Sequence, residues 1–458
     1  MTTTVARLGV IAVVAVIATG AALACTENLT APGRCPQYCP PEAIAFRDTI
    51  LDTSIVRDSA FGRPIGYVNP SSAPVMLAES LPGIGGRVSR AIFRFNPSSL
   101  RRVIRNTDTT TGPLLQADSV FVRLQILRRD SRATNLTLHL YRMPLSIDST
   151  TTFTTPAVSD SFALARIRGV NLDTLLARPT RKDSNLSAGA TVHFDSATGD
   201  RLQVDSILGQ PRLVLTLKFD SLAVPFDSTD SGKVALGVRV TADSFASATF
   251  GTSEVGQGPT LFWFNRFDSL GTKVSVRGPA RTTAGSDAFD GMVFSPAPTP
   301  LDSNLTVGGL PAARSLLRVQ LPRSLLDSTQ IVRATLILVP ADTVRGVPSD
   351  SFELLVHAAA VDFGQKSPLV LDISLAPDSL PVRVGTSDTL RVDVTNILRR
   401  WQTDTTLPHT LVLQQGIHML GLLYEGASLT ELHLYSSRAA QRRPVLRITY
   451  VPQIQFAP

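Results

Sequence analysis

The 458-residue chain has few of the residue types that usually carry catalysis or nucleic-acid binding. It contains 3 cysteines, 2 tryptophans and 6 histidines, and aromatic residues make up 6% of it. No two histidines have the spacing of a zinc-binding helix, and no phosphate loop, Gly-x-Ser-x-Gly elbow or His-Glu-x-x-His motif occurs. With so few aromatics and no recognisable module, nucleic-acid binding is not expected. The sequence predicts a non-enzyme; a hydrolase or lyase whose acidic residues meet only in the folded chain stays an alternative.

Long apolar runs are also scarce, and the single one present lies near the start of the chain. Residues 8–24 are almost entirely apolar and follow Arg7, which is typical of a secretory signal peptide. We therefore expect residues 1–24 to be a signal sequence. No later stretch has the length of a membrane-spanning helix.

The sequence Ala21-Ala-Leu-Ala before Cys25 resembles a bacterial lipobox. That resemblance implies that Cys25 is lipidated and becomes the first residue of the mature protein; ordinary cleavage beside an incidental cysteine is the alternative. Thr26 stands where Asp would imply inner-membrane retention. We expect an outer-membrane lipoprotein that faces the periplasm or the cell surface and is anchored by lipid.

Lipidation of Cys25 would leave one pair of cysteines, Cys35 and Cys39, in a tether over residues 25–41. The pair could form a disulfide in an oxidising compartment. A metal site is not expected, because two thiolates are too few ligands and no histidine is near. Calcium stays an alternative in an Asp-rich loop, for which Asp227–Gly232 is the best candidate although it lacks the usual alternating carboxylates.

The basic charge comes almost entirely from arginine. Lys and Arg number 44 against 37 acidic residues, and only five of the 44 are lysines. Such a surface could attract acidic polymers, or it could reflect solvated arginines alone. Three clusters are candidate anion-binding groups through charge-assisted hydrogen bonds: Arg101, Arg102 and Arg105; Arg128, Arg129 and Arg132; Arg438, Arg442 and Arg443.

Several segments alternate apolar and polar residues, which predicts strands with one buried face. In residues 120–126 the apolar set includes Val122 and Leu124, with Arg123 and Gln125 opposite; residues 213–219, 332–338 and 446–450 behave alike. Two such sheets packed face to face form a sandwich. One short helix is predicted over residues 394–401, capped by Thr395 or Asn396 and with Trp401 in the core. Trp263 is also expected in the core, so stacking on neutral sugars is not favoured.

The ordered strand signatures occur twice, which predicts a duplicated domain. Arg94 aligns with Arg318, Gly237 with Gly421, and Ser253 with Ser437. The first copy has the longer connections, one of them between Leu140 and Arg212. We expect an all-β fold of two tandem antiparallel jelly-roll-like sandwiches, divided as residues 42–265 for the first, 266–452 for linker and second, and 453–458 for a tail.

The second copy resembles the DNRLRE-type β-sandwich modules. Leu305–Gly309 with Arg314–Pro322 is similar to the opening of these modules, Val392–Trp401 to a later segment, and Tyr435–Tyr450 to their closing strand. The first copy matches less closely, through Arg90–Phe95 and Thr252–Pro259. The resemblance implies two tandem carbohydrate-binding-module-like domains with no catalytic role.

These observations together predict a lipid-anchored envelope protein that binds without catalysis. The expected ligand is an acidic polysaccharide. The alternative is a structural or adhesive envelope component that binds protein partners.

Overall fold

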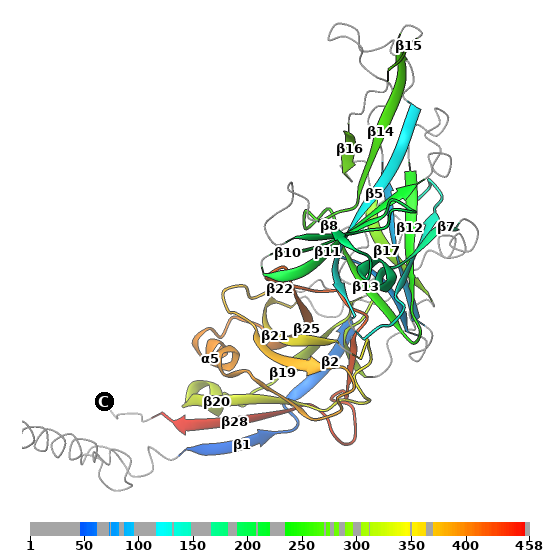
Figure 1. Ribbon diagram of the computed structural model, residues 1–458. Coiled ribbons are helices and arrows are strands. Elements are labelled where there is room, and N and C mark those ends of the chain that lie inside the picture. The colour runs from blue at the N-terminus through cyan, green and yellow to red at the C-terminus, as the bar shows by residue number, and fades with distance from the viewer. Residues whose placement is uncertain are drawn as a thin grey trace, which may run out of the picture.

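The computed structural model describes residues 46–61, 73, 75–81, 87–95, 116–130, 132–147, 166–181, 190–207, 209–219, 234–269, 272–274, 279–283, 289–295, 304–310, 312–348, 350–362 and 370–453. The prediction of an all-β, antiparallel fold is confirmed: antiparallel strands form two β-sandwiches (Figure 1). The predicted signal peptide, the tether with Cys25, Cys35 and Cys39, the arginines at positions 101, 102 and 105, and the loop Asp227–Gly232 lie outside the described residues.

Sandwich 1 contains two layers of strands. The first has the order β17 (Phe289–Ser295), β4 (Arg87–Phe95), β12 (Val234–Thr241), β6 (Thr137–Arg142) and β7 (Arg166–Asn171). The second has the order β16 (Pro279–Thr283), β14 (Thr260–Ser269), β5 (Gln116–Arg129), β11 (Gln210–Phe219), β10 (Arg201–Ile207), β9 (Thr191–Phe194) and β8 (Thr180–Arg181). The pair β3 (Val75–Leu81) and β13 (Ala246–Gly251) joins the layers, because β3 also pairs with β4 and β13 with β5. Two small elements complete this half: α3 (Leu172–Leu176) and β15 (Thr272–Val274).

Sandwich 2 repeats this arrangement. Its first layer has the order β2 (Ile55–Phe61), β19 (Arg314–Val319), β25 (Thr410–Met419), β21 (Ser351–Val361) and β23 (Asp378–Arg383). Its second layer has the order β1 (Arg47–Leu51), β28 (Val445–Pro452), β20 (Thr329–Leu338) and β24 (Leu390–Asp393). The pair β18 (Leu305–Gly308) and β27 (Glu431–Leu434) corresponds to β3 and β13, but it forms a separate two-stranded sheet that reaches its surroundings through isolated bridges such as Pro340–Leu434. The remaining elements are α4 (Arg323–Asp327), β22 (Val370–Leu371), α5 (Thr395–Thr403) and β26 (Leu422–Tyr424).

The same neighbour relations in both halves agree with a duplication. A matching hydrogen bond occurs in each: the backbone N–H of Ser253 donates to Asp290 at 2.9 Å, and that of Ser437 donates to Asp58. Asp290 lies opposite Phe93 and Asp58 opposite Leu317, so the two aspartates occupy equivalent positions. The alignment of Gly237 with Gly421 is wrong. Gly237 lies opposite Ile92 inside β12, whereas Gly421 lies in the turn after β25, where it has φ 79°.

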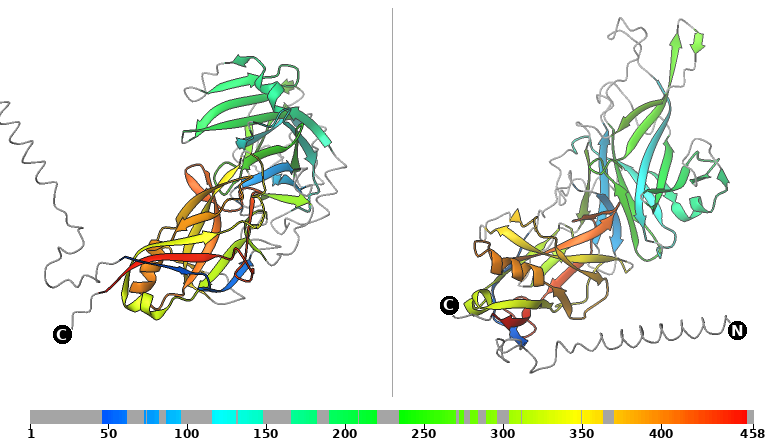
Figure 2. Two further views of the ribbon diagram at one scale, coloured as in Figure 1. Left: turned by 90° about the horizontal axis from the view of Figure 1, so that it is seen from below. Right: turned by 90° about the vertical axis from the view of Figure 1, so that its left-hand side faces the viewer.

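The strand pairing differs from the predicted domain boundaries at two places. β1 and β2, expected in the first sandwich, pair with β28 and β19 of sandwich 2. β16 and β17, expected in a linker, pair with β14 and β4 of sandwich 1. Figures 1 and 2 show the blue N-terminal strands against the yellow and red strands of sandwich 2. Each sandwich is thus completed by two strands that the sequence analysis placed outside it. These strands pair with the edges of β4 and β14 in sandwich 1 and of β19 and β28 in sandwich 2, because backbone groups at a strand edge need hydrogen-bond partners.

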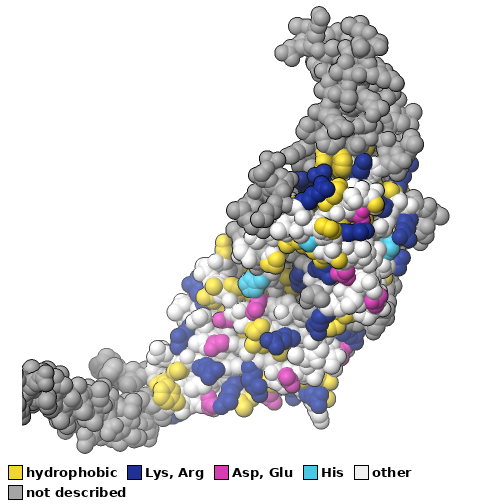
Figure 3. Space-filling view, viewed as in Figure 1, with side chains coloured by type: hydrophobic (Ala, Val, Ile, Leu, Met, Phe, Trp, Pro, Cys, Tyr) yellow, Lys and Arg dark blue, Asp and Glu magenta, His cyan; other side chains and the backbone are white. Residues whose placement is uncertain are grey.

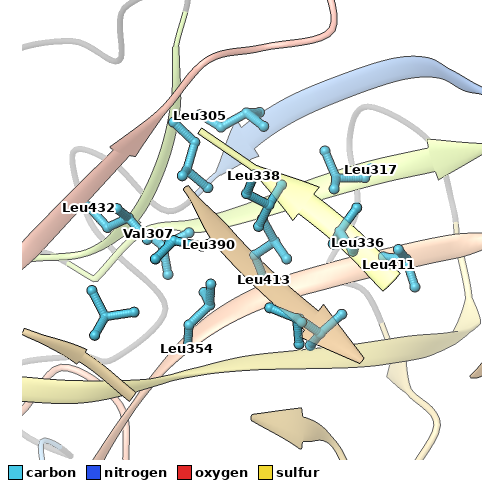
Figure 4. Close-up of a cluster of buried hydrophobic side chains, with 14 of the residues drawn as sticks. Leu305, Val307, Leu317, Leu336, Leu338, Leu354, Leu390, Leu411, Leu413 and Leu432 are labelled. Atoms are coloured by element: carbon cyan, nitrogen blue, oxygen red, sulfur yellow. The ribbon is translucent and has the colours of Figure 1, made fainter. Parts of the chain in front are cut away.

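Each sandwich has its own hydrophobic core. In sandwich 1 the core includes Phe93, Phe95 and Phe250, all buried between the layers. In sandwich 2 it consists mostly of leucines and valines from facing strands, such as Leu317, Leu336 and Leu411 (Figure 4). Burial of one such leucine contributes about 1.5–3 kcal/mol, so these side chains hold the layers of each sandwich together.

The predicted helix is present as α5, and Trp401 on it is fully buried, as expected. The predicted cap is wrong. Val394 occupies the N-cap position, and the carboxylate of Asp393 accepts from the backbone N–H of Thr395 at 2.9 Å. The Thr395 hydroxyl instead accepts from the backbone N–H of Ala334 at 2.9 Å, which ties the helix to β20.

The two sandwiches meet at a junction that is both apolar and charged. Val75, Leu77 and Met292 of sandwich 1 pack into the core cluster of sandwich 2. Arg128 at the end of β5 forms an ion pair with Asp350, which precedes β21 and also accepts from the Ser428 hydroxyl at 3.1 Å. The ion pair and the shared apolar cluster therefore fix one sandwich against the other.

Glu79 lies fully buried on the sandwich 1 side of this junction. One oxygen accepts from the Ser247 hydroxyl at 2.7 Å, and its other oxygen has no side-chain partner among the described residues. Burial first, and then the charge of Asp350, raise the pKa of Glu79 to about 7. This carboxyl group is therefore protonated in a substantial fraction of molecules at neutral pH.

Candidate functional site

The outer face of the second layer of sandwich 1 combines phenylalanines with basic side chains. Strands β14, β5, β11, β10, β9 and β8 form it in that order. Alternation turns Val122, Leu215 and Leu202 into the core, so their neighbours face outward. The outward residues that concern us are Arg123, Arg181, Arg201, Lys218, Phe121, Phe194 and Phe262. We call this set the Arg–Phe face.

One end of the Arg–Phe face is built around Phe194. Arg201 lies directly opposite Phe194 on the neighbouring strand, and Arg181 follows on β8. The guanidinium carbons of Arg181 and Arg201 lie 4.9 Å and 5.6 Å from the centroid of the Phe194 ring. A guanidinium over a ring gains about 0.5–2 kcal/mol from the ring quadrupole. The ring therefore holds both arginines along the sheet while their donors stay in contact with solvent.

The other end of the face contains a stacked pair of rings. Phe121 and Phe262 lie opposite each other on β5 and β14, with centroids 5.1 Å apart and ring planes 9° from parallel. The guanidinium carbon of Arg123 lies 5.7 Å from the Phe262 centroid. Between the two ends lies β11, with Thr216 directly between Arg201 and Arg123 and the exposed Lys218 opposite Phe121. A chain-like ligand could contact both ends while it crosses the strands.

The charge of this face is positive. Arg181, Arg201 and Lys218 are exposed, and within the described part of the chain none of the three has a carboxylate partner. The single described acid among the outward residues of β10 is Asp205, which pairs with Arg212 at 3.0 Å. A hydrogen bond from the backbone of Ser206, followed by the bond from Arg212, lowers the pKa of Asp205. Arg212 is thus neutralised, whereas Arg181, Arg201 and Lys218 have no carboxylate beside them among the described residues.

Nearby ion pairs stiffen the support of the face. Arg178 pairs with Asp195 at 3.1 Å at the start of the loop between β9 and β10. Asp195 also accepts from the backbone N–H groups of Ala197 and Thr198 at 2.9 Å and 3.3 Å, which closes that loop. Arg168 pairs with the buried Asp200 and donates to the backbone carbonyl of Lys218 at 2.7 Å. The strands that carry Phe194, Arg201 and Lys218 are therefore fixed relative to one another.

Of the three arginine clusters predicted from the sequence, that of Arg101, Arg102 and Arg105 lies outside the described residues, and the other two lie at the end of β5 with the turn after it and in the loop before β28. Arg128 and Arg129 are engaged in ion pairs with Asp350 and Asp173, and Arg132 is exposed on a turn. In the loop before β28, Arg438 and Arg442 are exposed and Arg443 is half-buried. Arg442 lies 6.0 Å from the centroid of the Tyr435 ring. Arg128 and Arg129, two of the predicted anion-binding residues, therefore form ion pairs with aspartates of the protein itself.

The sequence carried a partial signal for the residues of the Arg–Phe face. Arg123 and Lys218 were recognisable as the polar side of alternating strands. Phe194, Arg181 and Arg201 lie in the longer connection between Leu140 and Arg212 that the offsets predicted in the first copy. That connection contains α3, β8, β9 and β10, and among the described residues of sandwich 2 no strand corresponding to β8–β10 pairs with β24.

Three further properties bear on function. Within the ranges given above, no group of three or more His, Cys, Asp or Glu residues could hold a metal ion. No helix among the described residues is long and apolar enough to cross a membrane. The side chain of Trp263 is not described, so its predicted core position stays a prediction.

Comparisons with known proteins give no family for this chain. No protein-family model matches it, and no curated protein sequence matches it. The resemblance of residues 300–452 to DNRLRE-type modules therefore stays a prediction.

Proposed function

We propose that this protein is a non-catalytic binding protein of the cell envelope, which holds an acidic polysaccharide on the Arg–Phe face of sandwich 1. The observation that carries the proposal is the Phe194 ring with a guanidinium from each side, Arg181 and Arg201. Arginine is suited to carboxylate and sulfate groups, because its planar fork of donors can bind two oxygens at once. The phenylalanine rings offer apolar surface to the sugar carbons between the acidic groups.

Spacing across strands supports a polymeric ligand over a small one. Neighbouring strands lie about 4.8 Å apart, and the face crosses six strands from β14 to β8. Repeated charge on a polymer could contact cations at both ends of such a face. Lipid anchorage through Cys25, which the sequence predicts, would place this binding at a membrane.

The test is affinity electrophoresis and calorimetry with polygalacturonate, using neutral dextran as the reference polymer. We expect binding to polygalacturonate alone, and weaker binding at 500 mM than at 50 mM NaCl, because ion contacts near a surface are screened by salt. Arg181→Gln with Arg201→Gln should lower the affinity at least about tenfold, since each charged hydrogen bond contributes about 1.5–3 kcal/mol.

The matched control is Arg132→Gln with Arg383→Gln, which removes the same charge from two exposed positions away from the face. Equal loss of affinity in both double variants would show that only net charge matters and would reject the Arg–Phe face as the site. Equal binding of dextran and polygalacturonate would reject the acidic ligand.

A second candidate, an adhesive component that binds protein, is favoured by one apolar edge. Val361 and Val370 face each other where β21 meets β22 and are 38% and 50% exposed, and Ile373 beyond them is 97% exposed. Exposed apolar side chains that lie close together often mark protein contacts. Partner binding that persists at high salt and is lost in Val370→Ser with Ile373→Ser would support this function.

A further inference from the structure

The outer face of the second layer of sandwich 2 carries exposed apolar side chains and arginines, and none of them belongs to the proposed polysaccharide site. Alternation along β1 turns Asp48 and Ile50 outward, and Phe46, just before the strand, has the same parity. Phe46 is 66% exposed and Ile50 is 64% exposed. These are two of the most exposed large apolar side chains in the described chain, and burial in their own sheet does not account for them.

A β-bulge in β20 adds a third apolar side chain to this face. The pairing of β20 with β28 shifts between Ile331 and Arg333, and Val332 at the shift is 37% exposed. Arg399 on α5 fixes the bulge, because it donates to the backbone carbonyls of Ile331 and Val332 at 2.8 Å and 3.0 Å. Bulges are enriched at sheet edges and next to functional sites, where they change the direction of a side chain.

Arginines surround these apolar residues. Arg447 lies opposite both Ile50 and Thr335, and Arg391 lies opposite Ile337. With Arg333 and Arg399 they make four exposed arginines, against the two aspartates Asp48 and Asp393, which leaves a net charge of +2. Asp48 is paired with Arg447, and Asp393 accepts from the backbone N–H of Thr395. Figure 3 shows Lys and Arg side chains among hydrophobic ones, with Asp and Glu side chains between them, over the lower part of the molecule.

We propose that this face, defined by Phe46, Ile50, Val332, Arg333, Arg391 and Arg447, rests on an anionic phospholipid surface. Apolar side chains that enter the headgroup region, together with arginines that contact phosphate, are the usual means of interfacial binding. Arginine side chains can also bury their stems while the guanidinium stays at the headgroups.

The short sequence distance between this face and the predicted lipid supports a membrane over another occupant. The described chain begins at Phe46 on this face, 21 positions after Cys25 where the sequence predicts the lipid. Figures 1 and 2 show β1, β28 and β20 at the end of the molecule opposite sandwich 1. Contact of this face with a bilayer would therefore hold the Arg–Phe face away from the membrane. The lipid surface does not depend on the polysaccharide proposal, because the two faces share no residue.

The test uses the chain from residue 25 with Cys25→Ser, which retains every described residue and has no lipid of its own. Binding is measured by co-sedimentation with vesicles of phosphatidylglycerol and phosphatidylethanolamine, and with vesicles of phosphatidylcholine. We expect at least tenfold stronger binding to the anionic vesicles, which weakens at 500 mM NaCl. Arg333→Gln with Arg391→Gln should reduce that binding about tenfold or more, because each arginine near an anionic surface contributes on the order of 1 kcal/mol.

Phe46→Ser with Ile50→Ser should reduce vesicle binding at both salt concentrations. The matched control is Leu422→Ser with Leu423→Ser, which removes two apolar side chains exposed by 61% and 42% on β26. Circular dichroism and a thermal melt establish that each variant is folded. Equal binding to both kinds of vesicle, or equal loss in the β26 control, would overturn the proposal. Polygalacturonate binding should be unchanged in all of these variants, so failure of one proposal leaves the other testable.

Discussion

Glu79 shows how one buried carboxyl group can make the junction between the sandwiches sensitive to pH. Its pKa is raised to about 7 by burial and by the nearby Asp350, whereas an exposed glutamate has a pKa of 4.5. Between those values the folded protein binds more protons than the unfolded chain, so stability falls as pH rises. Burial also raises the pKa of Asp350, which adds a contribution of the same sign.

We predict that Glu79→Gln stabilises the protein at pH 8 and leaves it nearly unchanged at pH 4.5. Glutamine keeps an acceptor for the Ser247 hydroxyl and carries no charge. The difference should be on the order of 3 kcal/mol, since one pKa unit corresponds to about 1.4 kcal/mol. Urea unfolding of both proteins across this pH range measures it, with Glu353→Gln on β21 as the control. An unaltered pH dependence in the Glu79 variant would contradict the assignment.

Arg128 gives a second prediction at the same scale. Its partner Asp350 has a side chain that is only 1% exposed, so loss of the arginine would leave a buried carboxylate without its cation. Such losses cost about 3–5 kcal/mol when both groups are buried, and less here because Arg128 is 38% exposed. We expect Arg128→Met to lower the free energy of unfolding by roughly 2 kcal/mol.

Asp350→Asn should cost less than Arg128→Met, because the amide oxygen can still accept from Ser428. Chemical denaturation of both variants tests this order. Arg128→Met should leave polygalacturonate binding unchanged, although the sequence places Arg128 in a candidate anion-binding cluster with Arg129 and Arg132.

At the scale of strands, the paired aspartates on β2 and β17 connect distant parts of the chain. Asp58 accepts from Ser437 in sandwich 2, although it precedes all of sandwich 1 in sequence. We predict that Asp58→Ala destabilises sandwich 2, and Asp290→Ala sandwich 1, by about 1–3 kcal/mol each, because the backbone N–H of Ser437 or Ser253 loses the carboxyl group that accepts its hydrogen bond.

Tryptophan fluorescence can separate the two effects. Trp401 lies in the core of sandwich 2, so in a Trp263→Phe background it reports on that half alone. Asp58→Ala should shift the Trp401 unfolding transition more than Asp290→Ala does. A larger shift with Asp290→Ala than with Asp58→Ala would mean that β2 and β17 do not belong to the sandwiches that the strand pairing indicates.

The strands themselves were predictable from local pattern, but their partners were not. The alternation over 120–126, 213–219, 332–338 and 446–450 corresponds to β5, β11, β20 and β28. Alternation shows which face of a strand is buried and says nothing about which strand lies beside it. The predicted domain boundaries therefore place β1 and β2 in the wrong sandwich, and β16 and β17 in a linker. By register the counterpart of Gly237 is Val412, because Gly237 lies opposite Ile92 and Val412 lies opposite the equivalent Leu316.

The candidate site was predictable in part for the same reason. Arg123 and Lys218 are visible as outward residues because their strands alternate clearly. Phe194 lies on a four-residue strand and Arg181 on a two-residue strand, which are too short to show a period. Their approach to Arg201 depends on the register of β8, β9 and β10, which is a property of the folded sheet.

For the whole molecule, the lipid anchor predicted at Cys25 and the proposed membrane face make separable contributions to attachment. We predict that Cys25→Ala turns firm membrane association into a weak one that a wash with 500 mM NaCl removes. Fractionation of cells that produce each form measures this. Firm attachment of the variant after the wash would contradict lipidation at Cys25. Complete absence from membranes before the wash would contradict the membrane face.

The pairing of β1 with β28 means that the first and last described strands of the chain complete the same sandwich. During synthesis, residues 47–51 must remain without their partner until residues 445–452 have emerged. A chain that stops early, or loses its end to a protease, would present two unmatched strand edges and an open core. Sandwich 2 can therefore close only on a chain that includes residues 445–452, so its closure distinguishes such chains from those that stop before this strand.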